Sequence, residues 1–152
     1  MKPRSLNLSG AGERLGAVER PRTRHRRIRT AIVDDSPFFV ACLECFLEEQ
    51  EGFEVVAVAE TGLEAVERVA EFSPDLVLMD VRMPGMDGLE ATGRIKAREG
   101  SPVVIIITLE DNAGARAAAK AAGADGFVAK AAGMDDGLRS AIRRAFRRGK
   151  RR

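Results

Sequence analysis

Five short apolar runs, each followed by a longer amphipathic segment, constrain the fold of this chain more than any other feature. The runs are too short for buried helices, and several are rich in Val and Ile, which is typical of strands. Five βα units in series predict an α/β fold with a doubly wound, five-stranded parallel sheet and helices on both faces. The expected strands are Ile28–Val33, Phe53–Val58, Leu76–Met79, Val103–Thr108 and Phe127–Ala129.

The amphipathic segments between these runs have the length and periodicity of helices. Thr61, followed three residues later by Glu64, predicts a capping box at the start of the second helix. On that helix we expect one apolar side, formed by Leu63, Val66, Val69 and Ala70. The helices are expected near residues 36–50, 61–72, 88–98, 112–122 and 134–148.

Basic residues are concentrated at the two ends of the chain. Residues 1–27 hold eight Lys/Arg and two Glu, a balance of +6, and residues 139–152 hold eight Lys/Arg and no acidic residue, a balance of +8. Residues 28–138 hold nine basic and 21 acidic residues, a balance of −12. We expect 1–27 to be a disordered basic N-terminal arm, 28–148 a single domain, and 149–152 a basic C-terminal tail. The ends are either solubilising tails that fold back on the acidic body or contacts for nucleic acid or an acidic protein.

Several classes of protein are disfavoured by what the chain lacks. The longest apolar run, Pro102–Ile107 with its flanks, falls far short of the roughly 20 residues that span a bilayer. The Arg-rich beginning has no apolar segment of the kind found in secretory signals, so a cytoplasmic location is expected. Cys42 and Cys45 form a C-x-x-C in the middle of an expected helix, not at its start, where a thiolate is stabilised. We interpret them as small buried hydrophobic residues, and with His25 as the single histidine no zinc site is expected.

Polar side chains follow four of the expected strands at the point where each strand ends. Asp34 and Asp35 follow the first strand, Asp80 the third, Thr108 ends the fourth, and Lys130 follows the fifth. The carboxyl ends of parallel strands meet at one edge of the sheet, where ligands bind in such folds. We therefore expect these five side chains to converge.

Three carboxylates offset by a single lysine give this edge a local charge of −2, which is costly unless a cation neutralises it. A hard divalent cation with oxygen ligands resolves the problem, and Mg²⁺ suits a site that also holds phosphate. An Asp carboxylate can attack phosphorus and form an acyl phosphate. Lys130 and the Thr108 hydroxyl could then stabilise the phosphoryl oxygens. The pattern favours Mg²⁺-dependent phosphoryl transfer to one of these carboxylates.

Four segments of the chain resemble the receiver domain of two-component response regulators, the CheY-like family. The similarity covers about residues 28–148, and spacing and residue types agree in every segment. It implies a flavodoxin-like (βα)5 fold with strand order 2-1-3-4-5. The segments are Val33–Ser36, Leu78–Gly88, Ile107–Thr108 and Gly123–Lys130.

The resemblance implies a role for each residue at the strand ends. Asp80 would accept a phosphoryl group from a phosphohistidine on a sensor histidine kinase or a phosphotransfer protein. Asp35 and Asp80 would bind Mg²⁺ directly, Asp34 mainly through water, and Arg82 through its backbone carbonyl. Self-catalysed transfer and autodephosphorylation would be the only chemistry, so the protein would not be an enzyme acting on an outside substrate.

Thr108 and Phe127 match the switch pair of the family, although Phe127 alone could equally be an ordinary core aromatic. By resemblance, the hydroxyl moves to the phosphoryl group and the ring turns inward. The surface of the fourth helix, fifth strand and fifth helix would then change and control a downstream protein partner. No output domain is recognised in the chain, so a stand-alone receiver is expected.

Two other functions compete with this interpretation. The chain could be a nucleic-acid-associated regulator that acts through its basic ends under the control of phosphorylation. It could also be a hydrolase with an aspartyl nucleophile, but such enzymes typically have a second Asp two residues later, where this chain has Arg82.

Three positions refine the resemblance. Ala131 follows Lys130, where many receivers have proline. Leu109 is larger than the residue usually found after the threonine, which predicts slow exchange of the phosphoryl group with small molecules. Arg82 and Glu110 each lie two residues beyond a site residue, so they either pair across the mouth of the site or remain two solvated charges.

Overall fold

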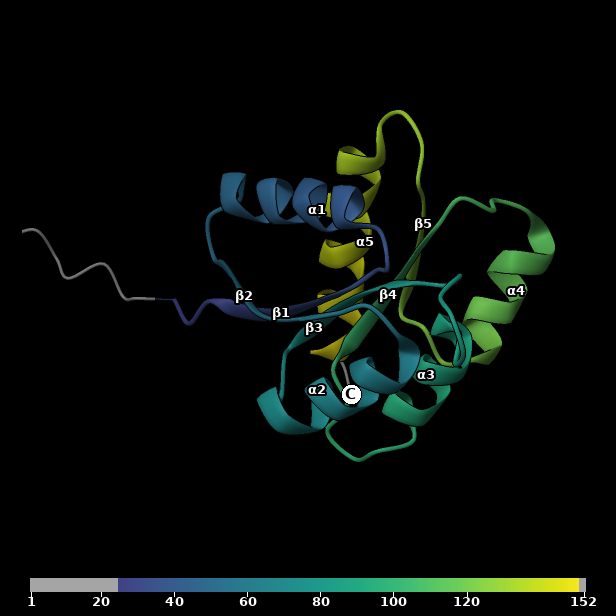
Figure 1. Cartoon of the computed structure of the whole chain (residues 1–152). Helices are drawn as coiled ribbons and strands as arrows, with labels where there is room; N and C mark the ends of the chain where they lie inside the picture. The colour runs from purple at the N-terminus through teal and green to yellow at the C-terminus, as the bar shows by residue number, and fades with distance from the viewer. Residues whose placement is uncertain (1–24, 151–152) are drawn as a thin grey trace, which may run out of the picture.

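The computed structural model describes residues 25–150 of the chain. The expected arm and tail therefore lie largely outside the described residues. Within the described range, five strands and five helices alternate (Figure 1). The strands are β1 Ile28–Val33, β2 Phe53–Ala59, β3 Leu76–Asp80, β4 Val103–Thr108 and β5 Gly126–Ala129. The helices are α1 Pro37–Glu49, α2 Gly62–Phe72, α3 Gly88–Lys96, α4 Ala113–Ala121 and α5 Met134–Gly149.

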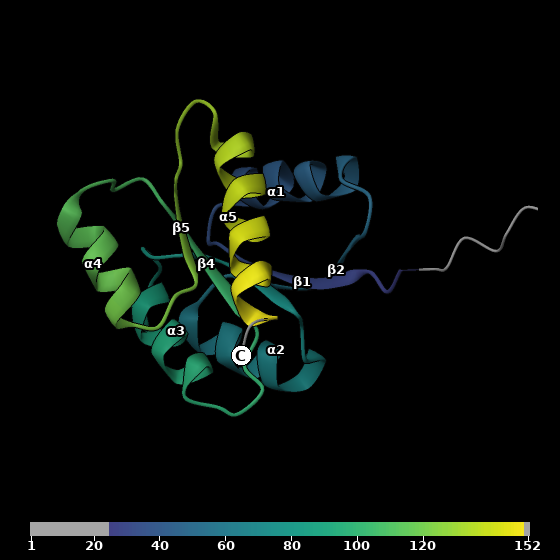
Figure 2. The same ribbon diagram turned by 180° about the vertical axis from the view of Figure 1, so that it is seen from behind.

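All neighbouring strands in the sheet pair in parallel, in the order β2-β1-β3-β4-β5. The predicted doubly wound α/β fold and its strand order are confirmed. Crossovers to both sides of β1 leave α1 and α5 on one face of the sheet and α2, α3 and α4 on the other, as Figures 1 and 2 show from opposite sides.

The central strand β3 shows how the sequence forms two cores. All five of its residues are buried. Because side chains alternate along a strand, Val77 and Met79 contribute to the cluster under α2, α3 and α4, whereas Leu76 and Leu78 contribute to the cluster under α1 and α5. A strand covered on both faces needs apolar residues at every position, which explains its short, continuous apolar run.

Polar caps fix where the helices begin. Ser36, Thr61, Asp87 and Asn112 each accept a hydrogen bond from the backbone N–H three residues on, a contact worth about 1 kcal/mol. The predicted cap at Thr61 is present, but the Glu64 carboxylate accepts from the backbone N–H of Glu60 and not from that of Thr61. The caps hold the amino ends of these helices at the edge where the strands end.

The predicted apolar side of α2 is wrong in part. Leu63 is 53% exposed and Ala70 is exposed, whereas Gly62, Ala65 and Val69 face the core. Gly62 sets the rotation of the helix, since a Cβ there would lie 2.4 Å from the Met86 carbonyl oxygen. This contact between distant segments turns Leu63 towards solvent.

The interpretation of Cys42 and Cys45 as buried hydrophobic residues is also wrong. Cys42 is partly buried and Cys45 is exposed. The buried side of α1 is formed by Leu43, Phe46 and Leu47. With that side against the sheet, the helical period places Cys45 on the outer surface.

The first described residues contact the domain, and the last helix runs slightly past its expected end. Arg26, which precedes β1, pairs with Asp75 at 2.8 Å. At the other end, α5 continues through Gly149, one residue beyond the expected end of the domain. Among the described residues, no helix is both long enough and apolar enough to cross a membrane.

Candidate functional site

Three carboxylates meet where β1 and β3 end. Asp34 and Asp35 directly follow β1, and Asp80 is the last residue of β3, the strand paired with β1. Each residue offers a carboxylate oxygen, and these three atoms lie within 4.8 Å of one another. Asp34 is 2% exposed and Asp80 is 7% exposed, while Asp35 faces solvent. The topology therefore brings together the acidic residues singled out from the sequence.

Lys130 supplies the cation of this cluster. Its Nζ lies 2.7 Å from Asp34 Oδ2 and 3.2 Å from Asp80 Oδ1, and its side chain is 5% exposed. The backbone N–H of Lys130 donates to the Thr108 carbonyl at 2.8 Å, which fixes the residue to the end of β4. One lysine offsets only one of the three carboxylate charges, so the cluster keeps a formal charge of −2.

Phe39, on the first turn of α1, also holds this lysine. The Lys130 ammonium lies 4.0 Å from the centre of the Phe39 ring, a cation–π contact. Phe39 was not among the site residues singled out from the sequence. Its position just after Asp34 and Asp35 was the available signal, but the contact depends on how α1 packs over the strand ends.

The pKa of Asp80 is raised above its ordinary value. Burial is the main cause, and the Asp34 carboxylate raises it further. The Lys130 charge and its hydrogen bond act in the opposite direction. Burial thus outweighs the lysine, so the folded protein without a metal ion resists ionisation of Asp80.

Thr108 and Phe127 lie on the same face of the sheet. Ile106 of β4 pairs with Phe127 of β5, and Thr108 is two residues further along β4. The Thr108 hydroxyl is buried and accepts a hydrogen bond from the Glu110 backbone N–H at 3.3 Å. Phe127 is partly buried against the cluster under α4. The two side chains are thus diagonal neighbours on adjacent strands.

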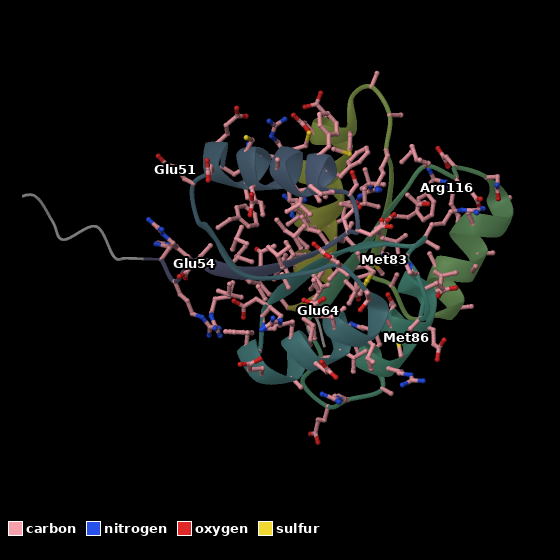
Figure 3. All side chains as sticks on the ribbon, viewed as in Figure 1. Glu51, Glu54, Glu64, Met83, Met86 and Arg116 are labelled. Atoms are coloured by element: carbon pink, nitrogen blue, oxygen red, sulfur yellow. The ribbon has the colours of Figure 1, made fainter. Side chains whose placement is uncertain are left out.

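Arg116 of α4 covers the Phe127 ring from outside. Its guanidinium carbon lies 4.6 Å from the ring centre, and its Nε donates to Asp111 at 2.8 Å. Figure 3 shows Arg116 on the side of α4 that faces the rest of the domain. No motif or spacing in the sequence indicated this contact.

A shallow groove beside the carboxylates forms the mouth of the site. Arg82 and Glu110 line it together with Asp35, and the two form an ion pair, as the first of the two sequence alternatives predicted. Leu109, the larger residue that follows Thr108, is exposed. The predicted slow exchange with small molecules stays a prediction.

Gly88, the first residue of α3, lies against the backbone of Asp80. A Cβ at this position would lie 1.8 Å from the Asp80 carbonyl oxygen, and the Gly88 N–H donates to the Val81 carbonyl at 2.8 Å. Glycine is therefore required for α3 to begin this close to the site.

The donor set fits a hard divalent cation. Its atoms are carboxylate oxygens, they are close enough to share one ion, and two of the three residues are buried. Mg²⁺ prefers such ligands and commonly binds where phosphate also binds.

The family model of the response regulator receiver domain matches residues 30–143. The chain belongs to this family. Receiver domains of two-component signalling bind Mg²⁺ at an acidic pocket, and they interact with histidine kinases, phosphotransfer proteins and downstream targets. The position of the carboxylate cluster in this receiver domain is consistent with that pocket.

The receiver domain is similar to domains of several curated proteins and solved structures. It is 43% identical over 99 residues to the chemotaxis protein CheY of Halobacterium salinarum, covering 65% of this chain and 81% of that protein. It is 42% identical over 109 residues to a protein-glutamate methylesterase/protein-glutamine glutaminase of Caldanaerobacter subterraneus subsp. tengcongensis, covering 71% of this chain but 30% of that protein. The chain thus spans less than a third of that methylesterase. The solved response regulator domain of Thermotoga maritima CheB is 33% identical with a TM-score of 0.73, covering 79% of this chain and 96% of that one.

Proposed function

We propose that this receiver domain accepts a phosphoryl group on Asp80 from a phosphohistidine of a sensor histidine kinase or a phosphotransfer protein. A carboxylate oxygen of Asp80 attacks phosphorus, the phosphorus–nitrogen bond breaks, and the imidazole leaves with the electron pair of that bond. The product is an acyl phosphate. The observation that carries this proposal is the convergence of Asp34, Asp35 and Asp80 around Lys130 at one edge of the sheet.

The side chains of Asp34, Asp35 and Asp80, with the backbone carbonyl of Arg82, would hold the Mg²⁺ ion. The ion would supply positive charge that offsets both the carboxylates and the phosphoryl oxygens during transfer. Its binding would also favour the ionised form of Asp80, which burial opposes. Ion binding and the nucleophilic state of Asp80 are therefore coupled.

Lys130 and Thr108 are proposed to bind the transferred group. The Lys130 ammonium already lies 3.2 Å from Asp80 Oδ1, so a phosphoryl group on Asp80 falls within its reach. The Thr108 hydroxyl, at the end of β4, can donate to another phosphoryl oxygen. Both groups would stabilise the negative charge that the phosphoryl oxygens bring to this site.

Transfer is proposed to change the α4-β5-α5 face through Thr108 and Phe127. When the hydroxyl moves to the phosphoryl group, it vacates space on the face of the sheet that it shares with Phe127, and the ring can turn inward. Arg116 would then lose its cation–π contact, which links the change to α4. We propose that a downstream protein reads this face as a population shift between two packings.

We further propose that the chain acts as a cytoplasmic signalling module and not as an enzyme that turns over an outside substrate. The methylesterase relatives match it only across the receiver part, which supports this proposal. In the proposed organisation, residues 28–148 form the receiver domain between a basic arm at 1–27 and a basic tail at 149–152.

The test is phosphotransfer from a histidine kinase that has been autophosphorylated with radiolabelled ATP. Wild-type protein is expected to acquire the label with Mg²⁺ and to remain unlabelled with EDTA. Asp80→Asn should acquire none, because the amide cannot form the acyl phosphate. Asp136→Asn is the matched control, since Asp136 is exposed on α5 and should leave labelling unchanged. Equal labelling of the wild type and Asp80→Asn would remove the assignment.

A further inference from the structure

A second concave surface lies at the opposite edge of the sheet from the carboxylates. It is bounded by Ile28 and Phe53, the first residues of β1 and β2, by the end of α1, and by the C-terminal half of α5. Figure 2 shows α5 crossing this side of the domain next to α1. We call this surface the basal groove. Because it lies where the strands begin, it shares no residue with the phosphorylation site or its mouth.

The floor of the basal groove is apolar. It is formed by aliphatic and aromatic side chains that belong to the core cluster under α1 and α5, or that pack against it: Ile28, Phe46, Phe53, Ile142 and Phe146. Three of these five are phenylalanines. A groove with such a floor favours insertion of large apolar side chains from a partner.

One side of the basal groove is strongly basic. Arg139, Arg143, Arg147 and Lys150 line it at spacings of four, four and three residues, which places them in one stripe along α5. Arg139 is engaged by Gln50 and Asp136. Across residues 25–150, Arg143, Arg147 and Lys150 form no ion pair. Figure 3 places Glu51 and Glu54 at this end of the domain, but neither lines the groove.

We propose that the basal groove binds an acidic amphipathic helix of a partner protein. Such a helix would insert apolar side chains into the floor and pair its carboxylates with the stripe on α5. The stripe extends about 16 Å along the helix axis, so about three turns of a partner helix match it. Carboxylates spaced four residues apart on the partner would face arginines with the same spacing.

The shape of the basal groove argues against two other anionic partners. A membrane surface needs apolar side chains that protrude, but Phe46 and Ile142 are buried at the bottom of a depression. A single-stranded nucleic acid needs open ring faces for base stacking, and Phe46 is buried within the core cluster. Neither ligand would fill an apolar floor.

Segments of this chain, from the same molecule or from a second copy, are also poor occupants of the basal groove. Residues 1–24 hold six Lys/Arg and two Glu, so they carry the same sign of charge as the stripe. A second copy could offer the acidic outer side of α2, but Leu63 is its one large exposed apolar side chain. One leucine leaves most of the floor unfilled.

The experiment is a selection of peptides from a displayed random library of about 15 residues in a helix-favouring framework, against immobilised full-length protein. The expected consensus combines Leu, Ile or Phe at helical spacing with Asp or Glu at spacings of three or four. A peptide of that consensus should bind the wild type more weakly as salt rises, because the pairs at the rim are screened. Its affinity for Arg143→Glu/Arg147→Glu should fall at least about tenfold.

The matched control is Arg144→Glu/Arg148→Glu, which makes the same change of charge on the same helix at positions that do not line the basal groove. It should bind the peptide within about twofold of the wild type. Both double variants should keep wild-type thermal unfolding and phosphorylation on Asp80, which shows that they are folded.

Several outcomes overturn the proposal. A selection without enrichment, or a consensus lacking acidic residues, excludes an acidic helix as the partner. Equal losses in the two double variants would show attraction to net charge alone. Stronger binding to phosphatidylglycerol vesicles or to an oligo(dT) strand would assign the surface to membrane or nucleic acid. Self-association in analytical ultracentrifugation that Arg143→Glu/Arg147→Glu abolishes would assign it to a second copy.

Discussion

The pKa of the Asp80 carboxyl group is set by effects that oppose one another. Burial and Asp34 raise its pKa, and Lys130 lowers it by less than burial raises it. Without a metal ion, the folded state therefore binds the Asp80 proton more tightly than the unfolded state does. Ionisation of the residue that is proposed to react therefore costs more in the folded protein without a metal ion than in the unfolded chain.

This imbalance predicts how stability depends on pH. Between the ordinary pKa of an aspartate and the raised pKa of Asp80, the folded state holds more protons, so the free energy of unfolding falls as pH rises through that window. Above the raised pKa of Asp80, the free energy of unfolding falls no further on account of this group. In EDTA at a pH above that window, Asp80→Asn should unfold at a higher temperature than the wild type, because the amide has no charge to bury.

Thermal unfolding at several pH values checks this, because the difference between wild type and Asp80→Asn isolates one group from the other titrating carboxylates. Asp136→Asn, on the surface, should show no such gain. A difference that grows as the pH falls would have the wrong sign and would contradict the raised pKa.

Phe39 is predicted to position Lys130 through its ring. Phe39→Leu keeps an apolar side chain but removes the cation–π contact, worth ~0.5–1 kcal/mol, so the rate of phosphorylation by phosphoramidate should fall about threefold. Phe38→Leu is the matched control, since its neighbouring ring is exposed and lies over no described cation. Equal rates in both variants would show that the ring contributes nothing to the lysine.

At the scale of helices and strands, the sequence sufficed where local patterns decide the structure. The apolar runs located every strand to within one residue, and the predicted cap at Thr61 located the start of α2. The sequence failed to predict which side of a helix is buried where a contact between distant segments decides this. The rotation of α2 depends on Gly62 against the backbone of Met86, and the exposure of Cys45 depends on which side of α1 meets the sheet. Neither contact leaves a periodic signal in its own helix.

The start of α3 gives a sharp test of such a contact. Gly88→Ala would place a methyl group against the Asp80 carbonyl oxygen, so either the helix or the reactive residue must shift. We expect a loss of about 1–3 kcal/mol in the free energy of unfolding, together with slower phosphorylation.

Gly93→Ala is the matched control on the same helix. A Cβ there meets open space, so alanine should stabilise the protein by up to ~1 kcal/mol through helix propensity. Urea denaturation measures both changes. Opposite signs for the two substitutions are expected, and a stabilising Gly88→Ala would show that the close approach does not constrain the site.

At the scale of the whole molecule, the topology explains which parts of the site could be predicted. Parallel strands bring Asp34, Asp35, Asp80, Thr108 and Lys130 to one edge whatever the details of packing, so their convergence followed from sequence position. Contacts from helices, such as Phe39 on Lys130 and Arg116 on Phe127, depend on helix orientation and could not be foreseen. The sheet also separates two charged regions, with the acidic cluster at one edge and the basal groove at the other.

The thermodynamic consequence of the acidic edge is a dependence of global stability on Mg²⁺. An ion that binds only the folded state stabilises it by about 1.4 kcal/mol at ten times its dissociation constant, which is roughly 3–6 °C in thermal unfolding. Asp80→Asn starts from a higher unfolding temperature in EDTA but loses a ligand, so its gain from Mg²⁺ should be smaller. The gain should also shrink in the wild type as falling pH protonates the carboxylates. Thermal unfolding with MgCl₂ and with NaCl at equal ionic strength separates binding from screening. If Mg²⁺ stabilised wild type and Asp80→Asn equally, Asp80 would not be a ligand, and the link between ion binding and the reactive carboxylate would be lost.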